Sequence, residues 1–210
     1  NGYERKDMPS ETDLLNDSLS LIGAAPVTAI DDGSVSANHC QRLYPALRDA
    51  LIRSHHWNWA MTRIELDQDA IPPTTEFAFS YTLPADCLKV VEFAGADMDT
   101  SLSIPSFDTR MTSYFQYKIE GKKLMTNYGS AFIVYMARVT NPDLWDPLFY
   151  QVVASWLASK LATAITKDER KATELMKTAY GVLLPLAMAV DGQEGSVTPN
   201  TSDALTWGRR

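Results

Sequence analysis

The first third of the chain contains two segments whose apolar residues recur at the spacing of an α-helix. Ser10 and Asp13 fit a capping box, in which a hydroxyl and a carboxylate satisfy free amides at a helix start, and they predict a helix over about 11–23. A second helix is predicted from about 35 to 54. Its apolar face is formed by Cys40, Leu43, Leu47 and Leu51. Each of these helices therefore has one apolar face to bury.

The pattern changes in the middle of the chain to the alternation that is typical of half-buried strands. The predicted strands are residues 63–67, 77–81 and 88–93, a hairpin of 114–120 and 124–126 that turns at Gly121 and Lys122, and residues 131–139. Residues 95–113 are rich in Ser, Thr and Asp and are predicted to form a loop. We therefore expect a β-rich insertion between helical segments.

Helical spacing returns near the end of the chain. Asp146 followed by Pro147 predicts a helix start, because a proline at the first helical position needs no amide donor. The stripe of this helix comprises Phe149, Val153, Leu157, Leu161 and Ile165. Residues 166–169 fit a second capping box and open a predicted fourth helix, which Pro185 is expected to kink or end. The stripe of the fourth helix comprises Ala172, Leu175, Met176, Ala179, Leu183 and Leu186.

Together these elements predict an α+β fold. The two N-terminal helices lie within residues 1–60 and the two C-terminal helices within residues 140–190. We expect them to pair as a four-helix bundle, because that arrangement buries all four apolar stripes. The β-rich insertion spans residues 61–139, and residues 191–210 are predicted to form an extended C-terminal arm.

The composition limits the function classes. With 19 basic and 26 acidic side chains the formal charge is −7, and 45% of the residues are hydrophobic, which excludes wholesale disorder. An acidic chain with scattered basic residues is poorly suited to grip nucleic acid. The sequence has no uninterrupted apolar run of membrane-spanning length, so we expect no membrane partner. Its first residues contain no apolar segment of a secretion signal, and we expect a cytoplasmic protein with reduced thiols.

Candidate catalytic chemistry is sparse. Cys40 falls on the apolar face of its predicted helix and is interpreted as a core thiol, whereas Cys87 precedes a predicted strand. His55 and His56 are adjacent, so they do not share one face of a helix as metal ligands must. Four tryptophans near element ends are interpreted as core residues: Trp57, Trp59, Trp145 and Trp156. We therefore predict no catalytic, cofactor-binding or metal-binding residues.

The C-terminal arm is the candidate partner-binding segment. Tryptophan and arginine are the residues most enriched at the energetic centres of protein interfaces. In the arm they occur without apolar periodicity of their own. The residues predicted to bind a partner are Leu205, Trp207, Arg209 and Arg210.

Seven short motifs, taken in order, resemble one known family. They are NDSLSLIG at 16–23, PVT at 26–28, DDG at 31–33, CQRLYPALRD at 40–49, HWNWA at 56–60, YTLPADCL at 81–88 and LASKLA at 157–162. The chain resembles the tail tubular protein A family of short-tailed phages (podoviruses), the head-to-tail adaptors. The resemblance covers roughly residues 12–180, and its strength lies in the order of the motifs rather than in any one of them.

The resemblance implies a structural subunit without catalysis or cofactor. In that family a ring of adaptors, usually twelve, docks beneath the portal protein and carries the tail nozzle, which is built from a tail tubular protein B-like chain. Genomic DNA passes through the central channel without specific binding. The implied location is the head–tail junction of the virion, after synthesis in the cytoplasm of the bacterial host. An acidic balance suits a channel wall that DNA must not grip.

Two alternatives stay open at this point. One is a head-completion or connector protein of a long-tailed phage or prophage, although the predicted β-rich insertion favours the short-tailed type. The other is a cytoplasmic cysteine hydrolase that uses Cys87 and a histidine.

Overall fold

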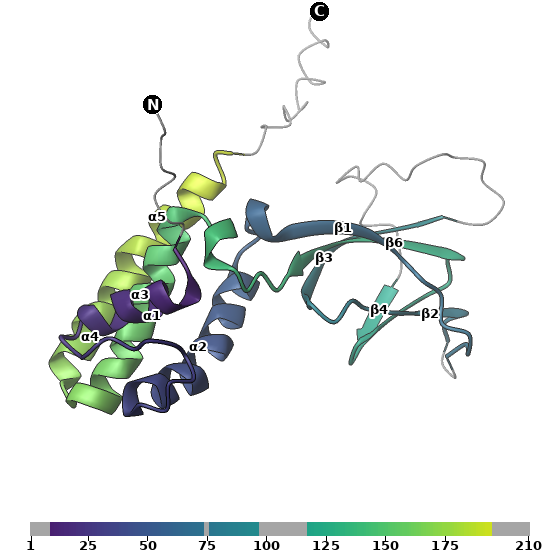
Figure 1. Cartoon of the computed structure of the whole chain (residues 1–210). Coiled ribbons are helices and arrows are strands. Elements are labelled where there is room, and N and C mark those ends of the chain that lie inside the picture. Colours follow the sequence, from purple (N-terminus) through teal and green to yellow (C-terminus); the bar gives the residue numbers. More distant parts are fainter. Residues whose placement is uncertain (1–8, 74–75, 97–116, 195–210) are drawn as a thin grey trace, which may run out of the picture.

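The computed structural model describes residues 9–73, 76–96 and 117–194, and it divides into a helical part and a β part that lie side by side (Figure 1). The helices are α1 (Glu11–Ser20), α2 (Val35–Ser54), α3 (Pro147–Leu161), α4 (Glu169–Thr178) and α5 (Leu184–Asp191). The strands are β1 (Met61–Leu66), β2 (Phe79–Thr82), β3 (Cys87–Ala96), β4 (Tyr117–Glu120), β5 (Lys123–Thr126) and β6 (Ser130–Ala137). Short 3₁₀ turns at Asn58–Ala60 and Pro142–Leu144 lead from α2 into β1 and from β6 towards α3. The fold is thus α+β.

The helical part is built around α3. This helix packs against α1, α2, α4 and α5, and each of those outer helices packs mainly against α3. The predicted four-helix bundle, in which each helix turns a single apolar stripe to a common axis, is therefore wrong. The physical reason lies in the composition of α3, which is apolar on nearly all sides, and such a helix belongs at the centre of a core. Its buried residues are Phe149, Val152, Val153, Ala154, Ser155, Leu157, Ala158, Ser159 and Leu161.

The segment Pro147–Thr166, which is α3 with its last turn, is long and apolar enough to cross a membrane by length and composition. It is the one helix of this kind among the described residues. Of its most apolar stretch, 56% is buried inside the protein. Its central position in the helical part accounts for this composition.

Local capping sets most helix boundaries. The capping box of α1 is confirmed, since the backbone N–H of Ser10 donates to Asp13 Oδ2 over 2.8 Å and the N–H of Asp13 donates to Ser10 Oγ over 3.1 Å. The predicted bounds of α2 are also confirmed. Asp146 caps α3 as predicted, with its Oδ1 accepting the N–H of Leu148 over 2.7 Å.

The second predicted capping box is wrong. The N-cap of α4 is Asp168, whose Oδ1 accepts the N–H of Lys171 over 2.8 Å. Thr166 instead belongs to a π turn, Ala162–Thr166, that ends the preceding helix, and its hydroxyl donates to the carbonyl of Ala162 over 2.9 Å. Lys167 follows with a φ of 56°, in the left-handed region, and this breaks the helix before α4 begins.

Pro185 does not end the fourth helical segment. A second π turn, Ala179–Leu183, connects α4 to α5, and the helix continues to Asp191. A π turn bonds each amide to the carbonyl five residues back, here Leu184 N–H to Ala179 O, so the backbone is already widened where the proline ring needs room. The proline is thereby accommodated within a helix that keeps its course.

The β part contains two three-stranded antiparallel sheets, with strand orders β1–β6–β3 and β2–β5–β4. The predicted hairpin is confirmed over β4 and β5, and Gly121 at its tip has a φ of 60°. The two sheets enclose a second core made of Leu66, Tyr81, Leu83, Phe93, Leu124, Ala131, Ile133, Tyr135 and Ala137. The predicted loop lies outside the described residues from position 97 onward.

Candidate interaction surfaces

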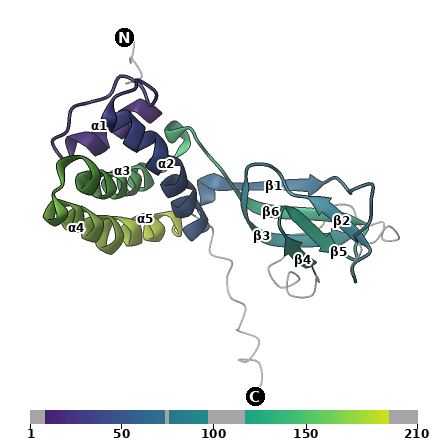
Figure 2. The same ribbon diagram turned by 90° about the horizontal axis from the view of Figure 1, so that it is seen from below.

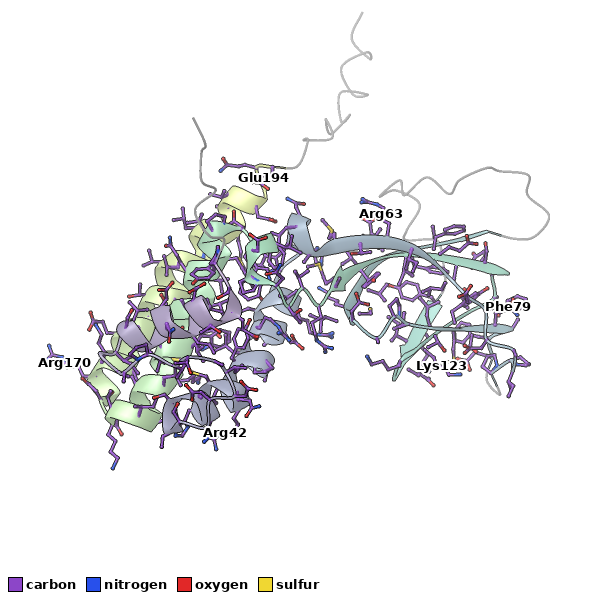
Figure 3. The ribbon with its side chains drawn as sticks, in the orientation of Figure 1. Arg42, Arg63, Phe79, Lys123, Arg170 and Glu194 are labelled. Atoms are coloured by element: carbon purple, nitrogen blue, oxygen red, sulfur yellow. The ribbon has the colours of Figure 1, made fainter. Side chains whose placement is uncertain are left out.

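The four residues predicted to bind a partner, Leu205, Trp207, Arg209 and Arg210, lie outside the described residues. The described chain ends at Glu194, directly after α5, at the end of the helical part away from Arg170 (Figure 3). The arm therefore continues from a defined point next to α5. The cysteines and histidines that were considered as catalytic or metal-binding residues lie within the described residues.

The two cysteines are placed as packed thiols rather than activated nucleophiles. Cys40 is fully buried in the helical core, and burial raises its pKa to about 11. Cys87 is half-buried at the start of β3, and burial together with the neighbouring carboxylate of Asp86 raises its pKa as well. A nucleophilic cysteine needs a lowered pKa and a thiolate. Both thiols instead have raised pKa values.

The histidines that follow α2 are structural contacts. His55 Nε2 lies 3.3 Å from Asp191 Oδ2, and its ring meets Trp57 edge-on at 4.8 Å between centroids. His56 Nε2 lies 3.1 Å from Lys89 Nζ. No group of three or more His, Cys, Asp or Glu side chains within the described ranges is placed to hold a metal ion. His55 is thus a half-buried, packed residue at the C-terminal end of α2.

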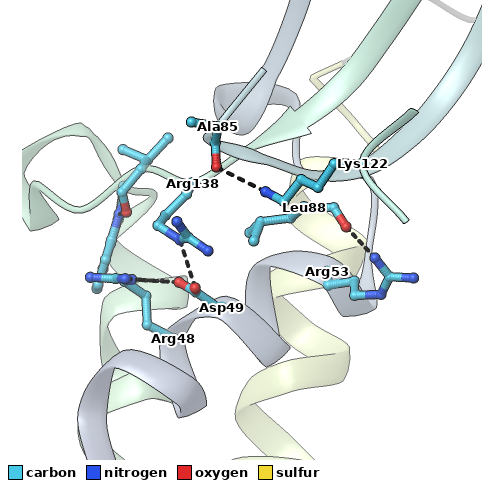
Figure 4. Close-up of polar contacts among 9 residues, drawn as sticks. Arg48, Asp49, Arg53, Ala85, Leu88, Lys122 and Arg138 are labelled. Carbon is cyan, nitrogen blue, oxygen red and sulfur yellow. Dashed lines mark hydrogen bonds and ion pairs between the residues drawn. The ribbon is translucent and has the colours of Figure 1, made fainter. Parts of the chain in front are cut away.

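Three charged residues connect the β part to α2. Asp49 accepts hydrogen bonds from Arg48 on its Oδ1, at 2.9 and 2.8 Å, and from Arg138 Nε on its Oδ2, at 2.6 Å (Figure 4). Arg48 is nearly buried, whereas Arg138 follows β6 directly. A carboxylate shared by two arginines from different parts of the fold fixes their relative position by charge-assisted bonds.

Next to this bridge an open pocket of about 480 Å³ lies between the end of α2 and the β part. Its cationic walls are Arg53, Lys89 and Lys122, and none of the three pairs with a carboxylate among the described residues. Arg53 donates to the carbonyl of Leu88 and Lys122 to that of Ala85 (Figure 4). In an acidic chain this is a local concentration of positive charge, suited to a carboxylate or another oxyanion.

The outer face of α4 and α5 carries exposed apolar side chains. We call the exposed residues Val182, Pro185, Leu186 and Ala189 the α4–α5 face; Val182 is 59% and Leu186 47% exposed. Residues 178–190 contain no charged side chain. The predicted stripe is confirmed for Leu175 and Ala179, which are buried, but it is wrong for Leu186, which faces outward, and for Met176, which is exposed at the groove between α3 and α4.

A spacing change explains the error. The buried positions Ala179 and Leu184 are five residues apart because the π turn inserts one extra residue between α4 and α5. This keeps the buried stripe on α3 and turns Val182 and Leu186 to the outside. The signal in the sequence was the uncharged run itself, since an ordinary surface helix carries polar residues on its outer face.

The opposite side of the helical part is acidic. Between Pro9 and Asn38 the chain has Glu11, Asp13, Asp17, Asp31 and Asp32 and no lysine or arginine. Asp32 accepts the N–H groups of Thr28 and Ser34 at 2.9 and 2.8 Å. A hydrogen bond from the side chain of Ser34 first, and then these two N–H groups, lower the pKa of Asp32 to about 2. Two exposed apolar residues, Leu21 and Val35, lie in the same segment. We call this segment the acidic side.

No protein-family model matches the chain, and no curated protein matches it either. The resemblance to the tail tubular protein A family therefore stays a prediction from the ordered motifs. The surfaces described above carry the functional argument.

Proposed function

We propose that the chain is a head-to-tail adaptor of a short-tailed phage, a structural subunit that works as part of a ring. The observation that carries the proposal is exposed apolar surface on two different sides of a helical part whose interior is already filled. Soluble monomers rarely expose contiguous apolar patches without a binding role. A subunit that contacts a neighbour on each side needs two such surfaces.

The remaining features fit the same assignment. The ring docks beneath the portal protein, carries the tail nozzle on its other side, and lies at the head–tail junction of the virion. The charge of −7 suits a channel through which genomic DNA slides without being held. The C-terminal arm follows α5 and is assigned to portal docking; its 16 residues beyond Glu194 reach on the order of 50 Å when extended. The function requires no cofactor.

Native mass spectrometry of the purified chain, with and without the portal ring encoded in its own genome, tests the proposal. A closed ring of copies on the portal, twelve by family resemblance, is the expected result. A chain that stays monomeric and does not bind the portal contradicts it. In that case alkylation of Cys87 is the next experiment, because loss of an activity on modification supports the hydrolase alternative.

The contribution of the arm is measured in the same assay. A chain that ends at residue 194, and so keeps Asp191 and α5, is expected to bind the portal more weakly while the helical part still unfolds cooperatively. Unchanged portal affinity after this truncation removes the assignment of Leu205, Trp207, Arg209 and Arg210 as partner-binding residues.

A further inference from the structure

The two apolar surfaces of the helical part lie on opposite sides of α3. Figure 2 shows α3 between α1 on one side and the continuous α4–α5 helix on the other. The buried faces of both outer elements are turned inward against α3. Their outward faces therefore point away from each other.

The α4–α5 side combines apolar and basic residues. Besides the α4–α5 face itself, residues 167–177, which form α4 and the turn before it, carry four basic side chains against three acidic ones. The basic residues are Lys167, Arg170, Lys171 and Lys177. Arg170 extends outward at the far end of α4 (Figure 3).

The acidic side has the complementary character. It exposes Leu21 and Val35, and the five carboxylates between Pro9 and Asn38 meet no basic residue within that segment. Hydrogen bonds lower the pKa values of Asp13 and Asp32, so both carry a full negative charge at neutral pH. The side chain of Asn16 connects α1 to the loop that follows it. Its Nδ2 donates to the carbonyl of Val27 over 3.0 Å, and its Oδ1 accepts the N–H of Val27 over 2.7 Å.

We propose that the α4–α5 side of one copy of this chain docks on the acidic side of a second copy, head to tail. Apolar residues then meet apolar residues, and basic side chains meet carboxylates. Pairing of two α4–α5 sides is disfavoured, because it sets the basic groups of both copies against each other. The inference rests on the proposed function, for which it names the contact between neighbouring subunits.

The geometry agrees with a closed ring. A contact between two different surfaces repeats from copy to copy and closes when the accumulated rotation reaches a full turn. In a ring of many subunits each step turns only a small angle, so the two surfaces must lie nearly opposite each other on the subunit. The position of α3 between α1 and α4–α5 fulfils this condition.

Single charges placed on each surface test the contact. Leu186→Glu adds a negative charge to the α4–α5 face, opposite the acidic side, and Val35→Lys adds a positive charge to the acidic side. Both positions are exposed, so the variants are expected to melt like the parent chain. The matched control is Leu144→Glu, at an exposed leucine that belongs to neither surface, 61% accessible. The readout is the fraction of closed rings on the portal by native mass spectrometry.

We expect Leu186→Glu and Val35→Lys each to lower the fraction of closed rings at least about tenfold, because a charge buried at an interface against like charge weakens every contact in the ring. Leu144→Glu is expected to assemble like the parent chain. Normal rings from Leu186→Glu overturn the inference and leave the adaptor function standing. A parent chain that never assembles overturns both.

Mixing the variants separates a head-to-tail contact from a symmetric one. The Leu186→Glu chain keeps an intact acidic side, and the Val35→Lys chain keeps an intact α4–α5 face. Chemical cross-linking is therefore expected to give pairs that contain one copy of each variant, whereas each variant alone gives none. If the Val35→Lys chain cross-links to itself as well as the parent chain does, the contact joins two α4–α5 faces and the inference is wrong.

Discussion

The helices α3 and α5 have similar compositions and opposite surroundings. Both are apolar on nearly all sides, yet α3 is covered by four other helices, while α5 packs mainly against α3. Val182, Pro185, Leu186 and Ala189 lie on or beside the uncovered face and are exposed. A helix that is apolar all round belongs in an interior. In the proposed ring, this uncovered face of α5 is the surface that a neighbouring subunit would bury.

The largest expected difference between α3 and α5 is in how much a substitution lowers the free energy of unfolding. Phe149 of α3 is fully buried, and its ring centroid lies 4.9, 4.8 and 5.2 Å from those of Trp57, Trp59 and Trp145. Phe149→Ala is expected to lower the free energy of unfolding by about 3–5 kcal/mol, because it leaves a cavity among these rings.

The matched substitution in α5 is Leu186→Ala, which is expected to change stability by less than about 0.5 kcal/mol. Urea unfolding followed by tryptophan fluorescence measures both. Similar losses for the two variants contradict the contrast, since they mean that Leu186 is as well packed in the isolated chain as Phe149.

A second comparison concerns carboxylates. Asp191 at the end of α5 is buried: its Oδ1 accepts the N–H of Asn58 over 2.9 Å, and its Oδ2 faces His55 Nε2. Asp191→Ala removes a buried carboxylate, so the N–H of Asn58 loses its acceptor and His55 loses its charged neighbour. The expected loss is about 2 kcal/mol.

The control is Asp31→Ala, at an exposed aspartate of the acidic side, with an expected change within about 0.5 kcal/mol. Thermal melting of the full chain distinguishes the two. An Asp191→Ala variant as stable as Asp31→Ala shows that the end of α5 is not fixed to the turn after α2.

Sequence periodicity and capping patterns depend on residues that are close together in the chain. For this reason they predict several helix ends correctly. The caps at Ser10 and Asp146 and both ends of α2 depend on neighbouring residues alone, and all are confirmed. Which helices meet depends on long-range packing. The predicted four-helix bundle is wrong because α3 has no polar face. It lies at the centre of the helical part, whereas in the predicted bundle the four helices surround a common core.

The surface with the strongest functional argument was missed for a related reason. A stripe drawn at regular helical spacing puts Leu186 together with Leu175, because an inserted π turn leaves no mark in the apolar pattern. The uncharged run from 178 to 190 was the available clue. The predicted arm residues, Trp207 among them, lie outside the described part, so their assignment remains a prediction.

The smallest expected effect concerns a half-buried carboxylate at the protein surface and depends on pH. Asp69, before β2, accepts hydrogen bonds from Lys123 Nζ at 2.8 Å and from the hydroxyls of Ser80 and Thr82 at 2.7 Å. These bonds, that of Lys123 first, lower its pKa from 3.8 to about 2. A lowered pKa in the folded state means that the contribution to stability is complete above 3.8 and is lost as the pH falls towards 2.

Asp69→Asn removes the charge and retains one acceptor, so it isolates the contribution of ionisation. At pH 6 the variant is expected to be less stable than the parent chain by at most about 1 kcal/mol, because the group is close to solvent and its ion pair is screened. The difference should shrink between pH 4 and pH 2 and vanish at the lower end, as the parent chain also becomes protonated there. Urea unfolding of both chains across this range measures it. A difference that stays constant with pH means that the hydrogen-bond geometry of Asp69, and not its charge, stabilises the β part.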